Sequence, residues 1–106
     1  MKTSSEKRRR HVKFWRKFLR LTRGRVPVLK ALEVIAGEEK NASFVKVIGS
    51  IRLAMEQGIP MSQPLKKYSS EFSPSVVELV KMAEKSGEWD DIVQEIADGL
   101  VEETFD

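Results

Sequence analysis

The sequence contains no cysteine, so disulfide scaffolds and thiolate metal sites are excluded and nothing indicates an oxidising compartment. It contains a single histidine, His11. Hydrolases usually pair a Ser or Cys nucleophile with a histidine base, and this chain offers no other histidine for that role. Because His11 lies within a run of basic residues, we expect it to be solvated. The six glycines are scattered singly, a pattern that does not support a phosphate-binding loop. These absences predict a protein that is not an enzyme and that carries no cofactor.

Long apolar segments are also missing. No stretch approaches the roughly 18 to 20 apolar residues that cross a bilayer, because charges such as Lys46, Arg52 and Glu56 interrupt the apolar patterns. The charged N-terminus lacks the apolar segment of a secretory signal. A chain of 106 residues with 41% hydrophobic content has room for one modest core. We therefore expect one soluble domain in a reducing cytoplasm.

The charges are distributed unevenly along the chain, although the formal net charge is only +3. Residues 1–25 carry eleven Lys or Arg and only Glu6, a balance of +10. Residues 26–106 carry eight bases and fifteen acids, a balance of −7. This polarity predicts a basic, flexible head over residues 1–10 and a single helical domain over residues 11–106.

Apolar residues recur at helical spacing throughout the chain, and no segment alternates as a strand does. The pattern predicts an all-α fold, a compact six-helix bundle with short connections. The first expected helix covers about residues 8–23 and ends at Gly24, and the second starts at Pro27 and is stopped by Gly37. The third is capped by Asn41 or Ser43 and broken at Gly58-Ile59-Pro60, and the fourth has Ser62 as its N-cap and runs through Tyr68. The fifth is capped by Ser73, has Pro74 in its first turn and is stopped by Gly87, and the last starts at Trp89.

A faint internal echo relates residues 25–32 (RVPVLKAL) to residues 58–65 (GIPMSQPL). Each segment reads as a turn that leads into a helix, with a proline two residues after the first position. Chance recurrence of turn, proline and helix start is an equally good explanation of the echo.

The sharpest electrostatic feature is the basic run that begins at Lys7. Its members could neutralise phosphates or anionic headgroups, at roughly 1 kcal/mol per basic residue near a membrane surface. The competing interpretation is a structural helix with buried aromatic side chains and an incidentally basic face. The candidate residues for contact with an anionic surface are Arg8, Arg9, Arg10, Lys13, Arg16 and Lys17.

Four carboxylates cluster at Glu84, Glu88, Asp90 and Asp91. Their oxygens are ligands that a hard cation such as calcium accepts, but their spacing matches no EF-hand loop. The alternative is a solvated helix start whose acids suit the positive end of the helix dipole. We expect no specific metal site and leave calcium binding open.

Several short motifs follow one another in a recognisable order. Residues 58–65 (GIPMSQPL), 72–74 (FSP) and 82–89 (MAEKSGEW) are similar to the run G-x-x-L-S-x-A-L, F-P and G-E-x-S-G-x-L. Residues 18–33 resemble a helix that leads into a G-V-P-L-x-x-A-L turn. Together the motifs cover about residues 14–100 and resemble the F-domain family of inner-membrane platform proteins in type II secretion and type IV pilus assembly.

The chain departs from this family's pattern in two ways. Arg25 and Ala83 stand where the family has Gly, Pro64 replaces Ala, and Trp89 replaces Leu, which indicates a divergent member. Family members are integral membrane proteins with two copies of this cytoplasmic domain, each followed by membrane-spanning helices. Because this chain has one copy and no span, we expect either an excised N-terminal part or a truncated homologue.

The resemblance implies a scaffold at the cytoplasmic face of the inner membrane that contacts the cytosolic assembly ATPase and inner-membrane assembly proteins. A homodimer is compatible with a basic head and an acidic body, and contact with the membrane would use the basic head or segments absent here. Within the motif, Glu84, Ser86 and Gly87 are expected to form a structural corner or a partner contact. Glu84 is expected to hold that corner by accepting hydrogen bonds.

Two other functions remain open. The first is a nucleic-acid-binding helical domain that uses the basic head, in which case affinity would fall steeply with salt. The second is an adaptor that binds a helix of a partner in a groove of the bundle.

Overall fold

The structure is a computed structural model that describes residues 4–102. Every regular element within this range is a helix, which confirms the all-α prediction. The elements are α1 (Ser4–Arg23), α2 (Val28–Glu38), α3 (Ala42–Glu56), α4 (Ser62–Lys67), α5 (Pro74–Ser86) and α6 (Trp89–Val101). Residues 4–10 of the expected basic head belong to α1, whereas residues 1–3 lie outside the described range. The flexibility of the head stays a prediction.

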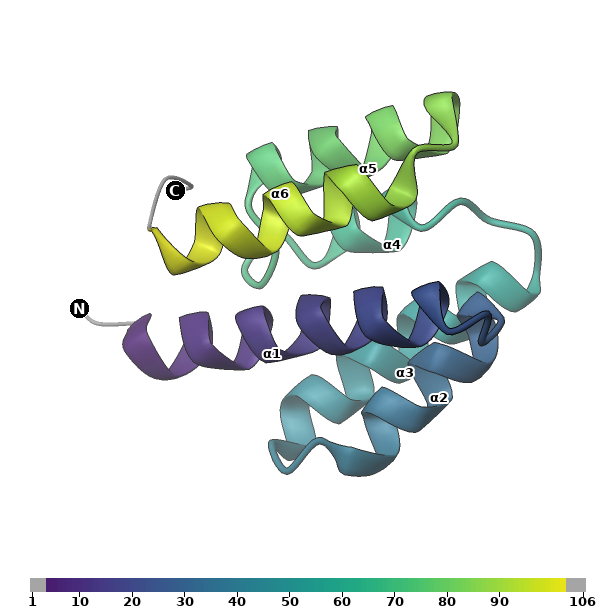
Figure 1. Cartoon of the computed structure of the whole chain (residues 1–106). Coiled ribbons are helices and arrows are strands. Elements are labelled where there is room, and N and C mark those ends of the chain that lie inside the picture. The colour runs from purple at the N-terminus through teal and green to yellow at the C-terminus, as the bar shows by residue number, and fades with distance from the viewer. Residues whose placement is uncertain (1–3, 103–106) are drawn as a thin grey trace.

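Helix α1 runs through the middle of the bundle (Figure 1). It packs along α6 on one side and against α2 on the other, while α5 lies on α6 and α3 lies on α2. The short α4 joins α3 to α5 and contacts both of these helices. Helices α1 and α6 run in opposite directions, so the start of α1 and the end of α6 lie at the same end of the bundle (Figure 1). One face of α1 is therefore buried between the two helix pairs and the opposite face is left outward.

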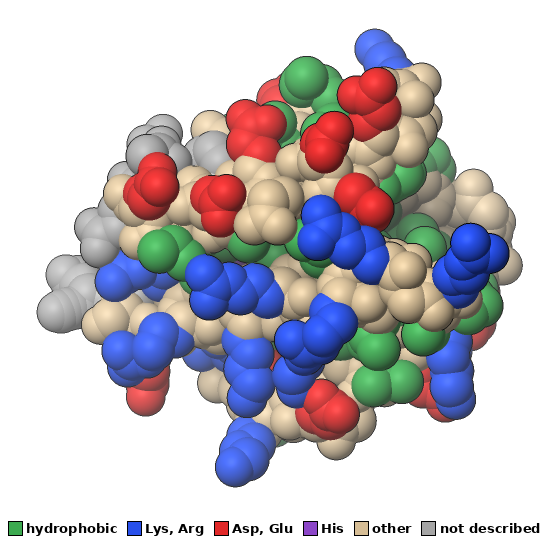
Figure 2. Space-filling model, viewed as in Figure 1, with side chains coloured by type: hydrophobic (Ala, Val, Ile, Leu, Met, Phe, Trp, Pro, Cys, Tyr) green, Lys and Arg blue, Asp and Glu red, His purple; other side chains and the backbone are tan. Residues whose placement is uncertain are grey.

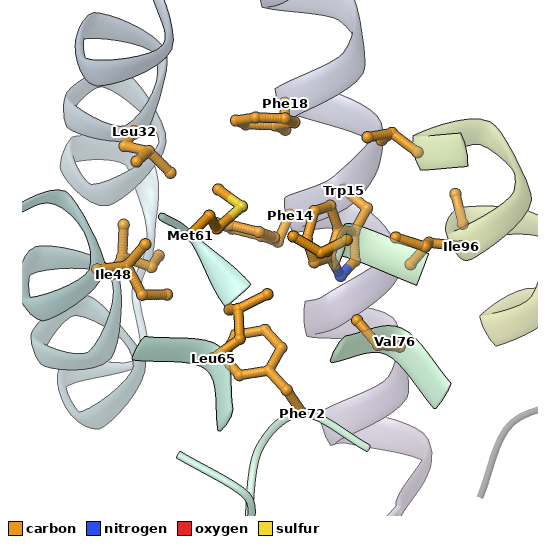
Figure 3. Close-up of a cluster of buried hydrophobic side chains, with 14 of the residues drawn as sticks. Phe14, Trp15, Phe18, Leu32, Ile48, Met61, Leu65, Phe72, Val76 and Ile96 are labelled. Carbon is orange, nitrogen blue, oxygen red and sulfur yellow. The ribbon is translucent and has the colours of Figure 1, made fainter. Parts of the chain in front are cut away.

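The inner face of α1 carries the largest side chains of the core (Figure 3). Trp15 is 0% exposed, and Phe14 and Phe18 are each 2% exposed. The ring of Trp15 lies edge-on to that of Phe14, with 4.9 Å between centroids, and 6.4 Å from that of Phe72, which precedes α5. The ring of Phe44, from α3, lies 5.7 Å from that of Phe14. Aromatic side chains bury large areas and prefer such edge-to-face contacts, so this cluster joins the two halves of the bundle.

Helix α1 begins at Ser4, about four residues before the predicted start. Contacts with the loop between α4 and α5 hold this extension in place, since Lys7 Nζ donates to the carbonyl oxygen of Ser70. One turn later, Arg10 lies over the ring of Phe44 at 5.4 Å from its centroid. The sequence pattern failed here because these partners are distant along the chain.

The prediction that Gly37 stops the second helix is wrong, because α2 continues to Glu38. A glycine ends a helix when it adopts a left-handed conformation, and Gly37 does not have a positive φ. Asn41 does cap α3 as predicted, since its side chain accepts a hydrogen bond of 2.9 Å from Phe44 N. The predicted Ser73 cap of α5 is also confirmed, with 3.3 Å between Val76 N and Ser73 Oγ.

The two echo segments form the same turn. Arg25 and Gly58, at corresponding positions, have φ angles of +69° and +86°. Directly after them, Val26 N donates to Leu21 O at 3.0 Å and Ile59 N donates to Ala54 O at 3.1 Å. These bonds define the Schellman ending of a helix, which requires one left-handed residue. The echo therefore reflects a shared backbone turn.

Arg25 has a left-handed backbone conformation that favours glycine, so substitution at this position tests the description of the turn directly. We expect Arg25→Gly to raise the free energy of unfolding by about 0.5–1 kcal/mol, because the left-handed penalty exceeds the added entropy of the unfolded chain. Gly58→Ala, the reciprocal change at the matching turn, should lower it by about 1 kcal/mol. Urea denaturation measures both effects, and a destabilised Arg25→Gly variant would contradict this description of the turn.

Candidate functional site

The family-like motif at the end of α5 reaches across to the start of α4. The Glu84 carboxylate accepts two hydrogen bonds of 2.8 Å from Ser62, one from the backbone N–H and one from the hydroxyl. Ser62 is 5% exposed, so these polar groups are shielded from water and depend on Glu84. Glu84 thus accepts hydrogen bonds as predicted, but from α4 rather than within the α5–α6 junction.

The prediction that Ser62 is the N-cap of α4 is wrong. Ser62 is the first helical residue, and Met61 occupies the cap position without a side-chain hydrogen bond. The Met61 side chain makes no cap hydrogen bond, and one free N–H at the start of α4 instead donates to Glu84 of another helix. A carboxylate at this place also suits the positive end of the helix dipole.

Ser86 and Gly87 shape the turn from α5 into α6. Gly87 has a φ of +79°, and its N–H donates to Ala83 O at 2.8 Å, as a left-handed helix ending requires. Ser86 Oγ accepts a hydrogen bond of 3.1 Å from Glu88 N. Each of the three motif residues therefore has a structural role, as a hydrogen-bond acceptor or as the left-handed residue of the turn. A contact of these residues with a partner stays a prediction.

Removing the Glu84 carboxylate should leave the two Ser62 donors without an acceptor. We expect Glu84→Ala to lower the free energy of unfolding by about 2–3 kcal/mol, since hydrogen bonds to charged groups are strong and the donors are shielded. Glu84→Gln should cost less, because its amide oxygen can still accept. A double-mutant cycle with Ser62→Ala in urea denaturation measures the coupling, and additive effects would contradict this pairing.

The acidic cluster is not assembled as a metal site. Glu84 is engaged with Ser62, and Asp90 lies 3.6 Å from Arg23 Nε of α1 as an ion pair. Among residues 4–102, no three His, Asp or Glu side chains come together in a way that could hold a metal ion. The four acids are therefore distributed over a corner, a loop and the first turn of α6.

The six predicted basic contact residues do not share one direction. Arg10 turns toward the bundle, where it lies 3.9 Å from Glu71 and over the ring of Phe44. Lys17 Nζ donates to the Glu38 carboxylate of α2. This contact and the charge of Lys17 lower the pKa of Glu38, which the charges of Lys13 and Arg20 lower further.

A row of exposed cations remains on the outer face of α1 (Figure 2). It consists of Arg9, Lys13, Arg16 and Arg20, and we refer to it as the basic row. Their spacing of four, three and four residues places them on one line of a helix. The prediction missed Arg20, although the helical period alone could have identified it.

The basic row borders a shallow groove between α1 and the end of α6. Val12, which is half-buried, and Val101, which is 48% exposed, supply apolar surface within it. Among residues 4–102, the polar side chains that line it are all cations: Arg8, Arg9, Lys13, Arg16, Lys17 and Arg20. Such a groove can hold an anionic, partly apolar group.

The expectation that His11 is solvated is wrong. His11 is 4% exposed, and its ring lies 4.9 Å and 5.0 Å from the rings of Phe44 and Phe72. Its Nε2 is 2.8 Å from Glu71 Oε1, and because a carboxylate only accepts, the neutral ring donates from this nitrogen. Burial lowers the pKa of His11 below its ordinary value of 6.5, against the opposing effect of Glu71.

The lowered pKa of His11 has a defined effect on stability. Below pH 6.5 the unfolded chain binds a proton at His11 more readily than the folded chain does, so acidification favours unfolding. We expect the urea midpoint to fall as the pH decreases from 6.5 through the lowered pKa. Glu71 raises the pKa of His11, and Lys7 and Arg10 lower it. All three residues are left unchanged in the test.

The control is His11→Gln, which keeps a donor for Glu71 and removes the titrating ring. Its urea midpoint should change less over the same pH range than that of the unaltered chain. An equal pH dependence in both proteins would show that His11 does not cause the effect.

Within residues 4–102, none of the six helices combines the length and the apolar content that a membrane span requires.

The sequence of this chain is similar to a known protein family and to several characterised proteins. The family model for protein F of the type II secretion system matches residues 14–105. Type IV pilus assembly protein TapC of Aeromonas hydrophila is 33% identical over 72 residues, which are 68% of this chain and 17% of TapC. Type IV pilus assembly protein PilC of Myxococcus xanthus is 30% identical over 84 residues, which are 79% of this chain and 20% of PilC.

PilC of Thermus thermophilus is 26% identical over 73 residues, which are 69% of this chain and 18% of that protein. The chain thus spans about a fifth or less of the length of these relatives. The match to the family model extends from the aromatic cluster of α1 through α6 and confirms the resemblance seen in the motifs. This chain belongs to the family of protein F of the type II secretion system.

Proposed function

We propose that this domain is a non-enzymatic contact module of an inner-membrane platform protein in type II secretion or type IV pilus assembly. In that role it lies at the cytoplasmic face of the membrane and binds the cytosolic assembly ATPase. The observation that carries the proposal is the family match over residues 14–105, which accounts for nearly the whole fold. The names of the relatives, all pilus assembly proteins, point in the same direction.

The outer face of α5 and α6 supports a contact with a protein. Glu78 and Glu95 border a shallow groove whose lining includes the apolar side chains of Pro74 and Leu79. Met82, one turn from Glu78, is 55% exposed. An apolar strip between acids is the surface that a basic, amphipathic segment of a partner complements. We assign the contact with the ATPase to this α5–α6 face.

Binding of the assembly ATPase from the same secretion or pilus system tests the proposal. We expect saturable binding, and a variant with Glu78→Lys and Glu95→Lys should bind roughly tenfold more weakly, because two complementary charges become repulsive. The matched control is Glu33→Lys with Glu56→Lys, which changes net charge equally on α2 and α3 and should bind like the unaltered domain.

Three results would count against the proposal. Absence of binding by a correctly folded domain would overturn the ATPase contact. Equal weakening by both variants would show that net charge, rather than the α5–α6 face, determines binding. Tight binding to DNA or RNA that falls steeply with salt, without binding to the ATPase, would favour the nucleic-acid alternative.

A further inference from the structure

We propose that the basic row of α1 binds the phosphate groups of anionic phospholipids at a membrane surface. The inference rests on the proposed function, since a domain of a platform protein lies beside a membrane. It concerns a surface other than the α5–α6 face around Glu78 and Glu95, so the two contacts do not compete for the same residues.

The cations of the basic row have no ion-pair partner in the part of the chain that the structure describes. Arg9, Lys13, Arg16 and Arg20 are all exposed, and none forms a hydrogen bond or ion pair with another described residue. Lys13 and Arg20 lower the pKa of Glu38, but that carboxylate already accepts a hydrogen bond from Lys17. The row therefore keeps positive charge available for an external anion.

The basic row is arranged so that its four cations can contact a flat membrane surface together. The four residues lie on one line of a straight helix, and a rise of about 1.5 Å per residue places the first and last about 16 Å apart. A flat surface of phosphates can meet all four together. Three of the four are arginines, whose planar guanidinium groups bind phosphate through two parallel hydrogen bonds.

The acids of α6 do not obstruct this approach. Figure 2 shows one group of acidic side chains above the basic row, with apolar side chains between them, and a few further acids below the row. Val12 and Val101 supply apolar surface in the groove that the basic row borders. A lipid surface offers apolar groups directly beneath its phosphates, so cations beside valines match its chemistry.

Lipid fits the groove better than a nucleic acid does. Single strands are bound through stacking on aromatic side chains, but Phe14, Trp15 and Phe18 of α1 are all buried. A duplex backbone presents phosphates without an apolar layer to match the valines.

Sedimentation with vesicles tests the proposal. The full chain should bind vesicles of phosphatidylcholine and phosphatidylglycerol in roughly a two-to-one ratio, and it should not bind phosphatidylcholine alone. Replacing Lys13 and Arg16 by Gln should weaken binding by roughly 25-fold, about fivefold for each charge. The matched control replaces Lys46 and Lys85 by Gln, which lowers the net charge equally on α3 and α5 and should retain binding within about twofold.

A reporter on the groove separates the site from general attraction. The chain has no cysteine, so Val101→Cys can be labelled uniquely with a polarity-sensitive dye. Anionic vesicles should shift its emission to the blue, while the same dye at Leu53→Cys, which is 56% exposed in the native chain on α3, should not respond.

The possible results decide between the alternatives. Equal loss of vesicle binding in both double variants, or equal dye shifts at both positions, would overturn the proposal. No binding to anionic vesicles would also overturn it, as would binding of random-sequence duplex DNA alone. Because ATPase binding is measured separately on the α5–α6 face, an unaltered domain that binds the ATPase but not anionic vesicles would refute this inference and leave the proposed function standing.

Discussion

The packing of the aromatic face of α1 between two helix pairs is the constraint on which the rest of the structure depends. Phe14, Trp15 and Phe18 enter the core together, and Trp15 is completely buried although its indole Nε1 has no hydrogen-bond partner among the described residues. The buried area of three rings outweighs the cost of that one unpaired donor. Because this face must point inward, the opposite face, with the basic row, must point outward.

A second constraint positions the short helix α4. Six residues cannot form a stable helix alone, so α4 depends on its neighbours. Glu84 bonds its first residue, and Leu65 is completely buried in the core. The family motif around Glu84 therefore has a physical role in joining α4 to α5. That role explains the motif without excluding a contact with a partner.

Local patterns predicted most of the helices, and long-range contacts account for the errors. Asn41, Ser73 and Gly87 act within three or four residues of their own positions, so their roles can be read from the sequence. His11 was misjudged because its partner Glu71 lies 60 residues away. Ser62 was misjudged for the same reason, since Glu84 lies 22 residues further along the chain. Of the basic candidates, only those that face outward on α1 fit the proposed contact.

Helix α1 has two separable faces: the inner face stabilises the fold, and the outer face carries the proposed site for anionic phospholipids. The most direct test measures thermal unfolding and vesicle binding on the same protein with Lys13 and Arg16 replaced by Gln. We predict an unfolding temperature close to that of the unaltered chain together with a large loss of binding. A variant that unfolds at a much lower temperature, or that binds as before, would contradict it.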